Sequence, residues 1–303
     1  MIKITRNFTR TEKIFCSIFI FIGAFIISNA VSVVITSYLC GGIMINNLTA
    51  ENTTEIFFLK ISQLLSSVIL FILPPIILAI LFQQKVSDFI NLKNSPNILK
   101  YLLIVLFMLT AFPLLSLITE WNEAIKFPEQ FQLIEKILRI AEETNAKIIN
   151  LIISENSIFS FILNIIVIAL IPAIGEEIVF RGVLQKYLGK LIKNQNFAIL
   201  ITAFIFSAIH LSFFGFFPRF ILGIFLGYLA YNFKSLYPSI FAHFFNNAMA
   251  VCMSFYFVRT NQEMSLEEMN FYPDNNIIFI ITILVAIGFG FLLFWKRKTK
   301  YVI

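Results

Sequence analysis

Charged side chains are scarce in this sequence. Asp, Glu, Lys and Arg make up 13% of its 303 residues and hydrophobic residues 59%, whereas soluble domains carry about 25% charged residues. Apolar runs long enough to cross a bilayer recur along the whole chain. The composition therefore excludes a soluble protein and predicts an all-α, polytopic membrane helical bundle with about eight transmembrane helices. The chain lacks internal repeats and low-complexity tracts, so we expect one integral membrane domain over residues 1–303.

Cysteine and histidine are also rare. The three cysteines, Cys16, Cys40 and Cys252, lie far apart and show neither disulfide nor metal-site spacing. There are only two histidines, His210 and His243, and both fall within apolar segments. Any chemistry that needs imidazole must therefore use these two side chains.

The basic residues follow membrane topology. The net charge is +6, but the lysines and arginines cluster beside apolar runs, so we expect a lipid bilayer and no nucleic acid as partner. Alternate loops are basic and acidic, which places both termini in the cytoplasm. Abundant Ile, Phe, Asn and Lys indicate a low-GC bacterial source and hence a bacterial cytoplasmic membrane. The predicted spans are residues 14–39, 57–82, 101–118, 158–193, 197–217, 220–233, 237–257 and 277–295.

Two segments allow more than one interpretation. The first apolar run resembles a signal peptide, but it continues past Ser28-Asn29-Ala30, which favours a retained span. Within residues 120–156, apolar residues recur at near-helical spacing, as expected for an amphipathic helix. That helix either lies on the outer surface of the membrane or packs against the bundle.

Three ionisable residues interrupt the fourth span. Glu177 and Arg181 are four apart, so they share one helical face and can pair, whereas Glu176 points about 100° away from Glu177. Pro172 cannot donate to the Ile168 carbonyl and should kink this helix. Each charge costs about 2.5–3.5 kcal/mol near the centre of a span. The cluster indicates either an active site or a structural ion pair near the membrane surface.

The two histidines lie in later spans of the same region. His210 follows Phe206 by four residues, and His243 shares a helical face with Asn247. A single histidine in a span is commonly a structural hydrogen-bonding residue. Because both histidines and the embedded acid pair fall in nearby helices, we interpret them jointly as a candidate active site. One geometric difficulty is that His210 is about 20 Å along its predicted helix, whereas His243 is near the start of its own.

Three motifs carry a family resemblance. The Glu-Glu-x-x-x-Arg of Glu176, Glu177 and Arg181, the Phe-x-x-x-His ending at His210 and the His-x-x-x-Asn of His243 and Asn247 occur in that order. They resemble the motifs of the CAAX-protease and bacteriocin-processing intramembrane peptidases, also called the Abi family, over about residues 158–258. The resemblance implies peptide-bond hydrolysis within the membrane by Glu176, His210 and His243, assisted by Asn247. A membrane-anchored or membrane-proximal peptide or protein would be the substrate.

Two reaction schemes remain open. In the first, Glu176 activates water, His210 orients it, and His243 with Asn247 stabilises the oxyanion. In the second, Glu176, His210 and His243 bind a zinc ion that activates the water. The chain lacks a His-Glu-x-x-His helix, and we favour the metal-free scheme. Competing functions are a membrane transporter, with helices broken at Pro74-Pro75 and Pro172, and a catalytically silent scaffold.

Overall fold

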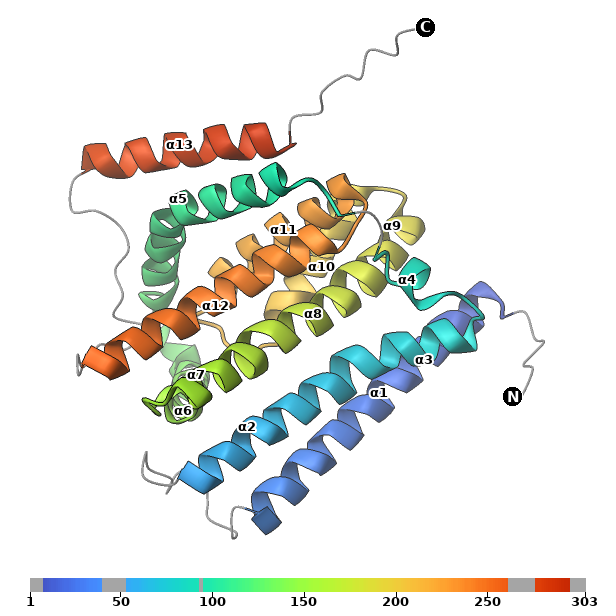
Figure 1. Ribbon diagram of the computed structural model, residues 1–303, viewed down its shortest axis with the longest axis horizontal. Coiled ribbons are helices and arrows are strands. Elements are labelled where there is room, and N and C mark those ends of the chain that lie inside the picture. The colour runs from blue at the N-terminus through green and yellow to red at the C-terminus, as the bar shows by residue number, and fades with distance from the viewer. Residues whose placement is uncertain (1–7, 40–52, 93–94, 261–275, 295–303) are drawn as a thin grey trace, which may run out of the picture.

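The computed structural model describes residues 8–39, 53–92, 95–260 and 276–294, and these contain helices and no strand (Figure 1). The prediction of an all-α membrane bundle is confirmed. The first half comprises α1 (Arg10–Val34), η1 (Ile35–Leu39), α2 (Thr53–Ser67), η3 (Val68–Ile72), α3 (Leu73–Leu81), α4 (Val86–Phe89), α5 (Ile98–Glu123), η4 (Glu129–Phe131) and α6 (Gln132–Ile153). The second half comprises α7 (Ile158–Asn164), η5 (Ile165–Leu170), α8 (Ile171–Glu177), η6 (Ile178–Gln185), α9 (Lys186–Ile192), α10 (Gln195–Ala208), α11 (Phe216–Phe233), α12 (Tyr237–Thr260) and α13 (Asn276–Phe294).

The continuous helix from α7 to α9 runs through the middle of the bundle. Figure 1 shows α1 and α2–α3 on one side of it and α12, α11 and α10 on the other, with α5 and α13 farther out. The segments η5 and η6 are π-helical, and η3 has the same form just before Pro74 and Pro75. A π-helical turn shifts the backbone bonding, and such turns are frequent at functional sites. Here one lies on each side of the segment that ends in Glu176 and Glu177.

Seven of the described helices are long and apolar enough to cross a membrane. The predicted span 197–217 differs, because α10 is only 14 residues long and ends at Ala208. The chain then turns, with Leu211 in the left-handed region at φ 51°, and α11 begins at Phe216 rather than Phe220. The seven long helices and the shorter α10 together account for the eight predicted apolar segments.

Two glycines allow α10 and α11 to approach closely. A Cβ atom on Gly223 would lie 3.0 Å from Ala203 Cβ, and one on Gly227 would lie 2.8 Å from Ile199 Cγ2. Small residues four apart permit this kind of helix contact in membranes. The contact also brings the backbone carbonyls of α11 close to η6, where the embedded charges lie.

Candidate active site

Glu177 and Arg181 form the pair predicted from their spacing. Both side chains are fully buried, and Arg181 Nη1 lies 2.5 Å from Glu177 Oε1. The second terminal nitrogen of Arg181 donates to the Gly223 carbonyl at 2.9 Å, and the guanidinium lies 4.7 Å from the centre of the Phe206 ring. The arginine therefore ties the charged helix to both α10 and α11. A buried pair of this kind needs such additional hydrogen bonds to offset its desolvation.

Gln185 continues the same line of side chains. It lies one turn beyond Arg181, and its Nε2 atom donates to the Gly227 carbonyl at 3.1 Å. Sequence reasoning overlooked this residue, although its four-residue spacing from Arg181 and its apolar surroundings were a usable signal. Gln185 and Arg181 thus hold η6 against two successive turns of α11.

His243 of α12 contacts both glutamates. Its Nδ1 atom lies 3.0 Å from Glu177 Oε1, and its Nε2 atom lies 3.8 Å from Glu176 Oε2. Because Glu177 is held by Arg181 as a carboxylate, its oxygen accepts, so His243 Nδ1 carries the proton and donates. The Nε2 atom is then the nitrogen that faces Glu176. Glu176 itself keeps 12% of its side chain exposed, whereas Glu177 has none exposed.

His210 lies in the turn that follows α10. Its Nδ1 atom is 2.7 Å from the Phe206 carbonyl, and a carbonyl can only accept, so this nitrogen also carries a proton. The Phe206 ring contacts both imidazoles, with ring centres 5.1 Å from His210 and 5.8 Å from His243. The Phe206 ring thus lies between His210 and His243 despite the predicted difference in depth, because α10 ends before His210 and its imidazole lies against Phe206.

The loop after His210 is held by a residue that the sequence did not indicate. Asn122, in the last turn of α5, is fully buried. It donates to the Phe213 carbonyl at 3.1 Å and accepts from the Phe217 N–H at 3.0 Å. No periodic pattern connects residues this far apart in the chain, so only the structure reveals the contact.

Asn247 lies one turn beyond His243 but makes a different kind of contact. Its Nδ2 atom donates to the Ile168 carbonyl at 3.4 Å. This carbonyl lies four residues before Pro172, whose nitrogen carries no hydrogen. Asn247 therefore supports the π-helical segment just before the proline, and one amide hydrogen remains for a second acceptor.

The residues fit a metal site only in part. Each histidine has its Nδ1–H on an oxygen acceptor, an arrangement also typical of metal-binding histidines. Among residues 8–39, 53–92, 95–260 and 276–294, however, no three His, Cys, Asp or Glu side chains are grouped so as to hold a metal ion. Glu176, His210 and His243 therefore form no metal-binding group in these parts of the chain.

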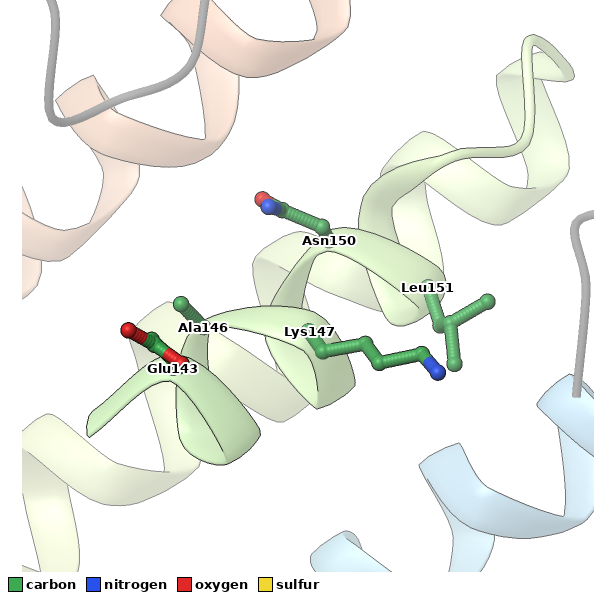
Figure 2. Close-up of a pocket in the computed structure, with 5 residues that line it drawn as sticks. All are labelled: Glu143, Ala146, Lys147, Asn150 and Leu151. Carbon is green, nitrogen blue, oxygen red and sulfur yellow. The ribbon is translucent and has the colours of Figure 1, made fainter. Parts of the chain in front are cut away.

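A separate open pocket of about 450 Å³ lies on α6 (Figure 2). Its lining residues are Glu143, Ala146, Lys147, Asn150 and Leu151. None of them is a predicted site residue, so this pocket is distinct from the cluster around Glu176.

The part of the chain that contains the cluster around Glu176 matches a known protein family. Residues 158–249 match the family described as type II CAAX prenyl endopeptidase, Rce1-like. The match confirms the resemblance that the three motifs indicated, and it contains Glu176, His210, His243 and Asn247. It covers about a third of the chain, from α7 into α12. No curated protein and no solved structure matches the chain.

Proposed function

We propose that this chain is an intramembrane endopeptidase that hydrolyses membrane-anchored or membrane-proximal peptides with water activated by Glu176. The observation that carries the proposal is the contact of His243 with both glutamates, at 3.0 Å and 3.8 Å, inside the region that matches the CAAX endopeptidase family. Glu176 is the only member of the acid pair that retains exposure. It is therefore the better candidate for a base that meets water and substrate.

In the proposed reaction Glu176 takes a proton from water as the water oxygen bonds to the scissile carbonyl carbon. The carbonyl oxygen then becomes an oxyanion, which His243 and Asn247 stabilise by hydrogen bonding. His243 already donates from Nδ1 to Glu177, so it can donate from Nε2 only as an imidazolium. Glu176 finally delivers its proton to the leaving nitrogen as the carbon–nitrogen bond breaks. His210, with Nδ1–H fixed, presents Nε2 as an acceptor that orients the attacking water.

The decisive experiment uses purified full-length protein in liposomes. A membrane peptide library is supplemented with a farnesylated peptide that ends in a CAAX sequence and with its unmodified counterpart. Wild type should release new termini, whereas Glu176→Gln, His210→Ala and His243→Ala should each abolish cleavage while remaining folded. Double variants should be little worse than single ones, because residues that act as a unit are not additive. Cleavage that persists in Glu176→Gln would overturn the proposal, and no cleavage by wild type would favour a silent scaffold.

A further inference from the structure

Helix α6 holds the loop that follows His210. The carboxylate of Glu142 accepts a hydrogen bond from the Ser212 hydroxyl and another from the Phe214 N–H, the latter at 3.3 Å. Arg219 of α11 donates to the same Ser212 hydroxyl at 2.7 Å. The backbone two to four residues beyond His210 is therefore fixed from two directions.

A second contact reinforces this face of α6. The Arg139 guanidinium lies 4.0 Å from the centre of the Phe214 ring and bonds to Glu135 at 3.0 Å. Glu135 in turn accepts from the Phe127 N–H at 2.8 Å. That backbone hydrogen bond, with help from Arg139, lowers the pKa of Glu135, which stays ionised. Glu135, Arg139 and Glu142 together form what we call the inner face of α6.

The opposite side of α6 is apolar and, within the part of the chain that the structure describes, exposed. Its large side chains are exposed by 71% at Leu133, 49% at Ile134, 58% at Ile137 and 51% at Ile140. We call these four residues the outer face. In water such a stripe would favour association, but in a membrane protein acyl chains can cover it.

The ends of the neighbouring spans indicate the level of α6 relative to the membrane. It is joined to α5, which ends at Glu123, and to α7, which begins at Ile158, by short connections. Trp121 lies in the last turn of α5 with 55% of its surface exposed and packs against Phe217 at 5.1 Å. Tryptophan is enriched where a span meets the headgroups. A helix that is connected at both ends to the ends of membrane spans is expected to lie along the interface.

We propose that α6 is a membrane-surface helix whose outer face lies among lipid acyl chains, and that Glu142 on its inner side is a positioning residue for His210. The membrane would thus be the partner of α6 and would hold the helix against the loop. The role assigned to His210 rests on the proposed function, whereas the lipid contact does not.

The lipid contact is tested by spin labelling in phosphatidylcholine liposomes. In a background with Cys16, Cys40 and Cys252 changed to Ser, nitroxides are attached to Ile137→Cys or Ile140→Cys. Glu143→Cys, in the open pocket of Figure 2, is the matched control. Dissolved oxygen should broaden the nitroxide signal at positions 137 and 140, whereas a water-soluble nickel chelate should not. At the control position 143 the nickel chelate should broaden the signal and oxygen should not. Broadening by the nickel chelate at positions 137 and 140 would overturn the proposed lipid contact. Exclusion of both reagents from these positions by a second copy of the protein would overturn it as well.

The positioning role is tested with Glu142→Ala, Glu142→Gln and the control Glu143→Ala. Amide hydrogen exchange at Phe214 should accelerate about tenfold in Glu142→Ala, less in Glu142→Gln, and stay unchanged in the control. The kcat for peptide cleavage should fall in the same order, by about tenfold for Glu142→Ala, with KM unchanged. Unaltered exchange would overturn the role of Glu142, whether or not the protein cleaves peptides. Faster exchange with unchanged kcat would confine Glu142 to a structural role.

Discussion

His243 Nδ1 donates a hydrogen bond to Glu177 Oε1 across 3.0 Å, and this joins α12 to the charged helix. The same oxygen accepts from Arg181, so one buried carboxylate oxygen serves two cationic or protonated partners. The sequence predicted only the pair with Arg181. In the proposed reaction Glu177 acts through His243 and is a positioning residue, because it sets which imidazole nitrogen faces Glu176.

Removing the arginine should mainly affect stability. Arg181→Ala leaves Glu177 buried without its charge partner, which we expect to cost about 3–5 kcal/mol. Arg181→Lys keeps the charge but lacks the planar fork that reaches both Glu177 and the Gly223 carbonyl, so its effect should be intermediate. Thermal unfolding in detergent measures the stability of both variants. Full stability combined with lost cleavage would instead give Arg181 a direct part in catalysis.

Metal removal separates the two reaction schemes. If Glu176 activates water without zinc, protein treated with a strong chelator and verified metal-free by elemental analysis should retain its rate. The control is the same protein with one equivalent of zinc restored. Activity that disappears with the metal and returns with stoichiometric zinc would make Glu176, His210 and His243 ligands and would reject the metal-free scheme.

Local periodicity made part of the site predictable. The Glu177–Arg181 pair followed from helical spacing, and the exposure of Glu176 agrees with its separate direction on the helix. The three motifs indicated the family that the match over residues 158–249 confirms. Long apolar runs were sufficient to predict the fold class.

Contacts between distant elements were not predictable. The bond between His243 and Glu177 joins residues 66 positions apart, and Asn122 reaches Phe213 across 91 positions. Neither contact leaves a periodic signal in a single sequence. The early end of α10 was also missed, since the apolar run continues through the turn and hydropathy alone does not mark a helix end.

The orientation of the chain remains a prediction from the basic and acidic loops. A reporter fused after Lys300 should read cytoplasmic, and one inserted near Glu267 should read external. Both positions lie outside the residues that the structure describes. Alkaline phosphatase and a fluorescent protein give complementary readouts at each site. If both reporters lie on the same side of the membrane, the predicted orientation is wrong.

The two substitutions that break a second buried charge pair should destabilise the protein by unequal amounts. Lys60 of α2 is 1% exposed and bonds to Glu155 and to Ser160, the latter at 2.5 Å, whereas Glu155 is 21% exposed. Glu155→Leu strands a fully buried ammonium and should destabilise more than Lys60→Met, which leaves a carboxylate with access to water. The larger loss is on the order of 3 kcal/mol, and the double variant should recover most of it. Equal losses would contradict this account.

The Lys60–Glu155 pair also predicts how thermal stability changes with pH. Burial raises the pKa of Glu155, but hydrogen bonds from Lys60 and Ser160 outweigh it and lower the pKa below the ordinary 4.5. A depressed carboxyl pKa contributes stability above the unfolded value and loses it as pH falls through the folded value. Thermal stability should therefore decline below about pH 4.5 more steeply in wild type than in the Lys60→Met/Glu155→Leu double variant. Parallel curves would exclude this pair as the cause.

We assign Asn247 two separable roles, a structural contact and a proposed contribution to catalysis. Its bond to the Ile168 carbonyl supports the helix next to Pro172, while its proposed oxyanion contact affects only the rate. Asn247→Ala should reduce cleavage by about 10²–10³, as expected for one lost oxyanion donor, and should lower stability by about 1 kcal/mol, as expected for one lost hydrogen bond.

A second substitution distinguishes the two effects of Asn247→Ala. Pro172→Ala supplies a backbone N–H that can donate to the Ile168 carbonyl, so it should restore the stability lost in Asn247→Ala. It supplies no donor near the scissile bond, so the rate should stay low. Unfolding temperatures and kcat are measured for both single variants and the double variant, with Pro172→Ala alone as control. If Pro172→Ala restores the rate together with the stability, Asn247 acts only by supporting the helix that carries Glu176.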